Sequence, residues 1–370
     1  MGILESVPAP ELEAVENRTR FAHFQFDKMG KGRRYSDIVV IKGSFDLVAE
    51  RIELASVQSP VVLSDEWWPA DASDTASLQA AGDLVLHKPA TDLLITGSAR
   101  RSPADGPFPW TTGFVVRDTQ RIYLNHQLEL IGPRHWEHRR LGGWVLSPAA
   151  PTHEVDLRYE LAYGGAYIDP KSLLLDDEPQ WIKHEANPSG LGFHNPAALD
   201  KLRTYPAPQI QHPKDRVKEM NRPVRLAGTG PVCRSWASRT RYAGTYDVRW
   251  HAQYQQALQA GQAPDYPADF DEQFFQCAAP DMICQGHLRG HEQIGLGQLL
   301  ADAPVFFTRL PGLAIEARAE MGPAAGSSTR AVLDTVHIDL DARQVHLGWR
   351  LRLTQPHGVR GLTLYAVPVA

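Results

Sequence analysis

The sequence predicts a mainly β protein: antiparallel sandwich- or barrel-like sheets with long ordered loops and a few short helices. Short β-rich segments recur about every ten residues in the first half, which is typical of antiparallel sandwiches and barrels. The C-terminal part alternates apolar and polar residues over two neighbouring segments, as paired strands do. The 29 Gly and 28 Pro residues are spread along the chain without a period, which favours many turns between short elements.

The strands expected in the first half each end at turn residues. The first is a continuous apolar run, Ile38–Ile41, and a later one is followed by Asp118 as a turn. Gly132-Pro133 closes the last of the group. The expected strands lie at 38–41, 51–54, 83–86, 92–95, 114–116, 121–124 and 128–131.

The middle of the chain, 181–231, is rich in Pro and Asn and only weakly periodic, so turns and extended segments are expected there. One helix is predicted over 247–260, where Val248, Tyr254 and Leu258 recur with Ala and Gln between them. The glycine that follows, at 261, is well placed to end it.

A β-hairpin is predicted near the C-terminus. Apolar residues lie on one face of a strand over 332–340, and over 345–353 they alternate with polar or basic residues. Asp341-Ala342-Arg343 supplies the turn between these strands. A closing strand is expected at 362–367.

At 370 residues the chain is longer than one hydrophobic core usually serves, so one compact unit or two joined β domains are expected. The pattern divides it into an N-terminal extension (1–20), an N-terminal antiparallel β region (21–180), a loop and short-helix region rich in Pro, Gly and aromatic residues (181–303), and a C-terminal β-hairpin region packed on the rest (304–370).

Composition and charge argue against several classes of protein. A hydrophobic content of 43% with 22% charged residues describes a soluble globular protein, and a net charge of -5 without a basic stripe argues against nucleic-acid binding. No signal peptide is visible in 1–20, and no apolar stretch is long enough to cross a bilayer. Three cysteines are too few for a disulfide framework. We therefore expect a cytoplasmic protein.

The segment 223–292 places large aromatic rings between carboxylates, Gly and Pro, which makes poor helix. Rings of this size would be left in water unless the segment packs as a built surface. An ordered, loop-rich face is therefore predicted. The rings that supply it are Tyr242, Tyr246, Trp250, Tyr266, Phe270, Phe274 and Phe275, and packing of most of them inside a scaffold is the alternative.

Four soft metal ligands fall within this segment: Cys277, Cys284, His287 and His291. Zinc requires about four such ligands converging tetrahedrally. The spacing matches no common zinc motif, and Gly286 and Gly290 interrupt any helix that would align the histidines, so buried thiols and surface imidazoles are favoured. The acidic residues at 265, 269, 271 and 272 also lack the calcium-loop pattern, so they are expected in turns. We expect no metal and no cofactor.

Candidate acid–base groups are present without a recognisable catalytic motif. Glu160 is expected to pair with an arginine of the 239–241 group as a structural lock. No nucleophile elbow, phosphate-binding loop or dinucleotide fingerprint occurs, so no enzyme is predicted. The alternative is a hydrolase or metal-dependent enzyme centred on Glu160, Asp247, Asp269, Asp271 and His287.

An ordered set of short motifs resembles a bacterial family known as domain of unknown function 2169. Two positions depart from the usual pattern: His291 stands where Asp is common, and Met282 where Gln is common. The resemblance extends over roughly 20–355. The motifs are Val39–Gly43, Lys88–Asp92 with Gly97, Gly132–Trp136, Tyr159–Gly165, Asn187–Gly190, Ala243–Asp247 with Trp250, Asp269–Asp271, Ala279–Asp281, Leu288–Glu292 and Trp349–Arg350.

The resemblance implies a non-catalytic adaptor, or chaperone, of the type VI secretion system. Proteins of this family are encoded beside toxic effectors and are thought to help load them onto the secretion spike. The implied partners are a secreted effector and, near it, a proline-alanine-alanine-arginine (PAAR) tip domain or the VgrG spike. A structural subunit of a phage-like assembly is a further alternative.

Residues outside the motifs are the candidate partner contacts, because cargo varies within such a family: Trp67, Trp68, Trp110 and Trp181. The motif residues are assigned to the scaffold instead. They are Lys88, Asp92, Trp136, Tyr159, Glu160, Gly164, Gly165, Gly244, Tyr246, Asp247, Trp250, Asp269, Phe270, Asp271, Pro280, Asp281 and Glu292.

Overall fold

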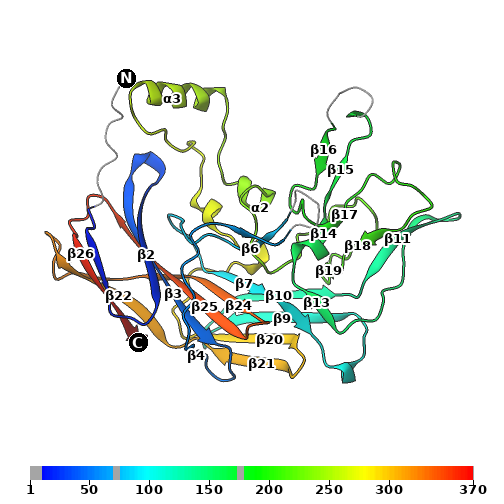
Figure 1. Ribbon diagram of the computed structural model, residues 1–370, viewed down its shortest axis with the longest axis horizontal. Coiled ribbons are helices and arrows are strands. Elements are labelled where there is room, and N and C mark those ends of the chain that lie inside the picture. The colour runs from blue at the N-terminus through cyan, green and yellow to red at the C-terminus, as the bar shows by residue number, and fades with distance from the viewer. Residues whose placement is uncertain (1–10, 70–75, 173–178, 370) are drawn as a thin grey trace.

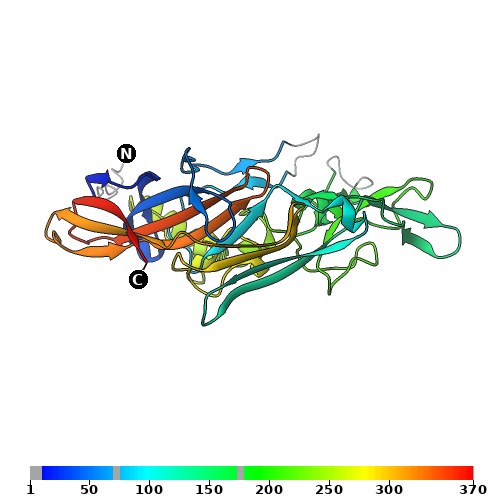
Figure 2. The ribbon, with the colours of Figure 1, turned by 90° about the horizontal axis from the view of Figure 1, so that it is seen from below.

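The computed structural model describes residues 11–69, 76–172 and 179–369. The protein is mainly β, with 41% strand and 10% helix, and its strands form several antiparallel sheets (Figure 1). This confirms the predicted fold class, and the described part of the chain contains sheets without a closed barrel. The molecule is elongated, as Figure 2 shows.

The central sheet joins the two ends of the sequence. Its strand order is β2-β3-β25-β24-β7, with β4 paired to β3, and only the β24–β7 pair is parallel. The continuous apolar run at 38–41 lies in β3 and is buried on both faces, as the absence of alternation predicts. The strands are β2 (Ala22–Met29), β3 (Tyr35–Asp46), β4 (Glu53–Leu54), β7 (Asp92–Thr96), β24 (Val332–Asp339) and β25 (Gln344–Thr354).

Two further sheets adjoin the central one. The second sheet has the order β19-β10-β9-β20-β21, and the end sheet has the order β1-β26-β22-β23. The second sheet contains β9 (Trp110–Arg117), β10 (Ile122–Leu130), β19 (Ile210–Gln211), β20 (Gln293–Leu300) and β21 (Ala303–Arg309). The end sheet contains β1 (Ala14–Asn17), β22 (Leu313–Met321), β23 (Ser328–Arg330) and β26 (Gly361–Pro368).

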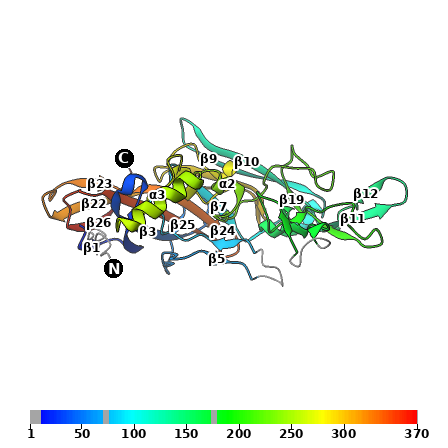
Figure 3. The same ribbon diagram turned by 90° about the horizontal axis from the view of Figure 1, so that it is seen from above.

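Short strands form smaller ribbons, most of them at the other end of the molecule. The β11–β12 hairpin reaches furthest from the end sheet, as the view from above shows (Figure 3). These strands are β5 (Glu66–Trp67), β6 (Leu78–Ala80), β8 (Ser98–Arg100), β11 (Arg134–Arg139), β12 (Gly143–Leu146), β13 (Glu154–Asp156), β14 (Tyr163–Gly164), β15 (Ala166–Ile168), β16 (Trp181–Lys183), β17 (Leu191–Gly192) and β18 (Tyr205–Ala207).

The described helices are short. They are α2 (Ala237–Thr240), α3 (Val248–Gln259) and the 3-10 turns η1 (Lys31–Arg33), η2 (Pro103–Asp105), η3 (Tyr159–Leu161), η4 (Glu272–Phe275) and η5 (Pro280–Met282). The helix predicted over 247–260 is confirmed as α3. Asp247 caps its first turn by accepting from the Trp250 N–H at 2.8 Å, and Gly261 follows it with φ of 71°.

One hydrophobic core unites the three large sheets. Ile41 of the central sheet, Phe114 of the second sheet and Leu364 of the end sheet belong to the same buried cluster. A smaller cluster covers the other face of β3, where Val40 packs with Phe270 and other side chains. Strand pairing also joins the predicted regions. β3 of region 21–180 pairs with β25 of region 304–370, and β1 within 1–20 pairs with β26.

The C-terminal hairpin is confirmed as β24 and β25, with the turn at Asp341–Arg343. The closing strand is β26, although it pairs in the end sheet and not with this hairpin. The strands expected at 121–124 and 128–131 are one strand, β10.

The prediction of a strand at 83–86 is wrong. The carbonyls of this segment meet cationic side chains and not a neighbouring strand: Arg350 Nη1 donates to the Asp83 and Val85 oxygens at 2.9 and 2.8 Å. Lys28 Nζ donates to the Leu84 oxygen at 2.9 Å. Backbone acceptors satisfied in this way need no sheet partner.

Candidate functional site

A buried ion network lies between the central sheet and the η4–η5 segment. Lys88 Nζ lies 2.9 Å from Asp92 Oδ2 and donates to Thr335 Oγ1 at 2.8 Å, and both charged side chains are almost fully buried. Asp92 also accepts from the Gln276 amide at 2.6 Å and from the Cys277 N–H at 2.9 Å. The network therefore ties the Lys88–Asp92 motif to the segment before η5.

A β-bulge extends this network. The register of β24 against β25 shifts between Leu333 and Thr335, and the Asp334 carboxylate accepts from Arg350 Nε at 2.6 Å. The Thr335 hydroxyl donates to Asp334 at 2.8 Å, which links the two ion pairs. Burial raises the pKa of Asp334, but Arg350 and Lys88 outweigh it and hold that pKa below its usual value.

A pocket of about 260 Å³ opens above these pairs, and we call it the ion-pair pocket. Its charged side chains are nearly all matched: Arg352 Nη1 donates to Glu272 at 2.9 Å, and Arg350 binds Asp334. The pocket is lined by His87, Lys88, Glu272, Thr329, Arg330, Val332, Asp334, Arg350, Leu351 and Arg352.

Two motif segments pack on one another where β14 pairs with β17. Asn187 is fully buried and donates to the Tyr159 and Tyr163 carbonyls at 2.9 and 3.2 Å. A Cβ on Gly164 would lie 2.1 Å from the Asn187 oxygen, and one on Gly190 would lie 2.5 Å from the Ala162 oxygen. Glycine is therefore required where these backbones meet.

Glu160 does form a lock, but with a different partner from the one expected. It accepts from the N–H and hydroxyl of Ser77 at 2.8 and 2.9 Å and lies 3.5 Å from Arg158. Arg239 is buried and donates to the Phe274 and Val232 carbonyls, so the expected pairing with the 239–241 group is wrong. Arginine satisfies buried carbonyls here because its five N–H donors reach several acceptors at once.

The carboxylates of the enzyme alternative have hydrogen-bonding partners in turns. Asp247 caps α3, Asp271 accepts from the Gln273 N–H at 2.8 Å, and Asp269 accepts from the Thr245 N–H and hydroxyl at 2.8 and 2.6 Å. His287 Nε2 donates to the Lys88 carbonyl at 2.8 Å. Within the described part of the chain, no hydrogen bond or ion pair joins any two of these groups or joins them to Glu160.

The four soft ligands have separate partners. Cys277 and Cys284 are buried, and burial raises the pKa of both thiols to about 12. Cys277 Sγ lies 3.2 Å from Asp92, His287 bonds to Lys88, and His291 is exposed. Within 11–69, 76–172 and 179–369, no group of three or more His, Cys, Asp or Glu side chains is arranged to hold a metal ion.

The candidate tryptophans differ in exposure. Trp67 and Trp181 are 53% and 58% exposed, while Trp68 is half-buried with Arg158 stacked over its ring at 4.7 Å. Trp110 is in the core, and its indole donates to the Gln298 carbonyl at 3.1 Å. It is therefore not available at the surface to contact a partner. An alternating strand buries every second residue, which explains its placement on β9.

The aromatic rings of 223–292 divide into two groups. Phe270 and Phe275 are buried against β3, whereas Tyr246 is 48% exposed beside Trp250, with ring centroids 4.6 Å apart. Gly244 has φ of 84° and packs against the loop that leads to Phe270. A Cβ there would lie 2.7 Å from Pro267. The other motif carboxylates bind locally: Asp281 to Arg225 at 2.6 Å, and Glu292 to three consecutive N–H groups.

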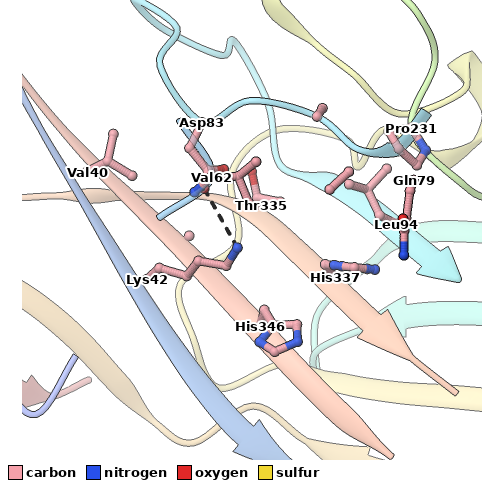
Figure 4. A pocket seen from close by; sticks show the side chains of 13 residues that line it. Val40, Lys42, Val62, Gln79, Asp83, Leu94, Pro231, Thr335, His337 and His346 are labelled. Atoms are coloured by element: carbon pink, nitrogen blue, oxygen red, sulfur yellow. Dashed lines mark hydrogen bonds and ion pairs between the residues drawn. The ribbon is translucent and has the colours of Figure 1, made fainter. Parts of the chain in front are cut away.

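Sequence reasoning missed a histidine pair in a small pocket on the central sheet (Figure 4). His337 and His346 are directly opposite one another on β24 and β25, with ring centroids 5.6 Å apart. Burial, with help from His346 and Lys42, lowers the pKa of His337 to about 3. The pocket holds about 40 Å³, and Lys42 points across it to Asp83 at 3.7 Å. The available signal was that the two histidines stand on either side of the predicted turn, four residues before it and three residues after it.

These features describe a β scaffold in which motif residues hold loops and sheets together. The chain belongs to the bacterial family described as "uncharacterized protein conserved in bacteria (DUF2169)", whose pattern matches residues 32–350. No curated protein and no solved structure matches the chain. Among the described residues, no helix has the length and apolar character to span a membrane.

Proposed function

We propose that this protein is a non-catalytic, cytoplasmic adaptor that binds a type VI secretion effector and promotes its loading onto the secretion spike. The partner is the effector, with its PAAR tip domain or the VgrG spike nearby. Membership of the family supports the resemblance from which this role follows. The motif carboxylates support it too, because they serve as caps and locks in turns.

The observation that carries the proposal is a pair of projections with exposed apolar side chains. The α3 segment and the β15–β16 ribbon rise from the same side of the sheets, at separate positions along the molecule (Figure 1). Trp181 on β16 is 58% exposed, Tyr246 just before α3 is 48% exposed, and Val248 at the start of α3 is 86% exposed. Exposed aromatic and aliphatic side chains on an ordered frame are the usual anchors of a protein interface.

The α3 projection is held in place by the β2–β3 hairpin. Asp265 accepts from the Gly32 N–H at 2.9 Å, and Lys31 Nζ donates to the Ala268 carbonyl at 2.5 Å. The Trp250 indole donates to the Asp265 carbonyl at 3.2 Å. A projection fixed by such contacts loses less conformational entropy on binding a partner than a free loop does.

The test is co-purification with the product of the adjacent reading frame. The wild-type protein should retain that product, and Trp181→Ala combined with Tyr246→Ala should weaken binding at least about tenfold. Val305→Ala is the matched control, because Val305 is 70% exposed on β21, on the opposite side of the molecule.

The proposal fails if no candidate effector binds and effector secretion is normal after deletion of the gene. Stoichiometric zinc that is lost on Cys284→Ser would favour a metal-dependent enzyme instead.

A further inference from the structure

A second pocket lies where the central sheet meets the end sheet, and we call it the arginine pocket. It holds about 390 Å³ and is lined by side chains from β22, β23, β24, β25 and the loop before β20. Its lining residues are His287, Leu288, Arg289, Ala314, Arg330, Ala331, Val332, Leu333, Trp349 and Val369. Its volume falls within the range of ordinary ligand sites.

The floor of this pocket is apolar. Trp349, Leu333 and Leu288 lie in it and are each less than 5% exposed, so their packing is already fixed by the core. Val332 and Val369 complete the wall and are half-buried. An apolar side chain entering here would leave water without requiring the core to rearrange.

Two guanidinium groups at this pocket lack acidic partners. Arg289 and Arg330 are exposed, and neither side chain makes an ion pair or hydrogen bond with any described residue. The acidic residue opposite Arg330 in the register, Glu316, binds Arg318 at 2.9 Å instead. Of the residues that the structure describes, no acidic one lines the pocket, although the protein as a whole carries a net charge of -5.

The loop that carries Arg289 is held in place by a buried carboxylate. Glu292 is fully buried and accepts from the Arg289, Gly290 and His291 N–H groups at 2.7, 2.9 and 3.1 Å. Gly290 has φ of 103°, and a Cβ there would lie 2.5 Å from the Leu313 oxygen. The backbone of Arg289 is therefore held rigidly beside the apolar floor, which lowers the entropy cost of using its side chain for binding.

We propose that the arginine pocket binds an acidic segment of the effector, one apolar side chain seated on the floor between carboxylates that meet Arg289 and Arg330. This inference rests on the proposed function and names a further contact with the effector, in addition to the two projections. Charge complementarity selects the occupant, because paired guanidinium groups bind carboxylates and the acidic protein otherwise repels an acidic segment. An apolar neighbour is required because the floor is apolar.

The first test uses short peptides. A fluorescein-labelled Glu-Leu-Glu-Leu-Glu peptide should bind the full chain more tightly than its Lys-Leu-Lys-Leu-Lys and Glu-Ser-Glu-Ser-Glu counterparts, as measured by fluorescence polarisation. Arg289→Gln with Arg330→Gln should weaken binding at least about tenfold. Arg51→Gln with Arg140→Gln removes the same charge from exposed sites that form no ion pair with any described residue, and should have little effect.

Several outcomes would overturn the inference. Equal binding of the Leu and Ser peptides, or full displacement by inorganic phosphate alone, would reduce the pocket to a simple anion site. Equal loss in both double variants would attribute binding to net charge. Unchanged thermal unfolding of the variants is expected, because neither side chain has a partner to lose.

The second test separates this inference from the proposed function. If the wild-type protein retains the adjacent gene product and Arg289→Glu with Arg330→Glu retains it equally, the arginine pocket is not the contact and the adaptor role stands. If the wild-type protein retains no effector, the adaptor role fails whatever the peptides show. Selective loss in the double variant, with Arg51→Glu and Arg140→Glu unaffected, supports both.

Discussion

The ion-pair pocket and the arginine pocket share Arg330 and Val332, but they differ in whether their arginine side chains are paired with carboxylates. In the ion-pair pocket, Arg350 and Arg352 each meet a carboxylate at under 3 Å. In the arginine pocket, two guanidinium groups face an apolar floor without an acidic partner. A matched charge fixes a structure, whereas an unmatched charge beside apolar surface is available to a ligand.

The largest expected effect on stability comes from the ion-pair pocket, where buried charges are paired. Lys88→Met removes the cation that faces Asp92 and leaves a buried carboxylate without its ion pair, so the free energy of unfolding should fall by about 3–5 kcal/mol. Urea unfolding followed by circular dichroism measures it. Arg18→Met breaks an exposed pair with Glu16 and should leave the midpoint unchanged. Equal effects of the two substitutions would show that burial of the pair has no special weight.

A smaller effect is expected where two backbones meet without charge. Gly164→Ala should lower the free energy of unfolding by at least about 2 kcal/mol, because the new Cβ would overlap the Asn187 carbonyl. Gly142→Ala is the control, since Gly142 also has positive φ but a Cβ there meets nothing within 4 Å. Thermal unfolding of the two variants separates overlap from backbone strain. Similar losses in both would remove the argument for close packing.

The histidine pair predicts how stability depends on pH. His337 binds its proton in the unfolded state near the ordinary pKa of about 6.5, but in the folded state only near 3. The folded protein therefore gains full stability from neutral His337 above pH 6.5 and loses it as pH falls towards 3, by at most about 1.4 kcal/mol per pH unit. Urea midpoints measured across this window should fall less steeply for His337→Gln. An identical slope would show that other groups govern acid unfolding.

The smallest effect is expected in the α3 projection. Asp247→Ala removes the cap of α3 and should destabilise that helix by about 1 kcal/mol, without changing global unfolding. Amide hydrogen exchange within 248–259 should accelerate. Arg249→Ala on the same helix should not have this effect, because Arg249 is exposed and makes no ion pair within the described part of the chain. Unchanged exchange in Asp247→Ala would mean that contacts with the β2–β3 hairpin alone hold the helix.

The spacing of apolar residues along the sequence, together with the residue types at turns, made much of the fold predictable. The alternation in 345–353 and the turn at Asp341–Arg343 identified the C-terminal hairpin, and the continuous run in Ile38–Ile41 identified a buried strand. Sheet membership was not predictable, because it depends on pairings between distant segments, such as β26 with β1. The loop at 83–86 looked like a strand because its apolar residues, Val85 and Leu86, are buried against β3.

The candidate site was less predictable than the fold. Motif residues such as Lys88 and Asp92 were recognisable as scaffold from their order, but their mutual contact required the fold. The arginine pocket combines β22, β23, β24 and β25 with the loop before β20, and only tertiary structure brings Arg289 near Arg330. A missing acidic partner is invisible in a sequence, because it is a property of the surroundings and not of the residue.

The pairing of β3 with β25 also has a consequence for how the chain is made. Val39 lies opposite Leu351, so β3 has no partner on that edge until the roughly three hundred residues between these strands have left the ribosome. Synthesis of the intervening residues takes on the order of tens of seconds, during which an apolar edge strand is exposed. Premature termination anywhere before β25 would therefore yield an incomplete central sheet with a tendency to aggregate, and not a shorter working protein.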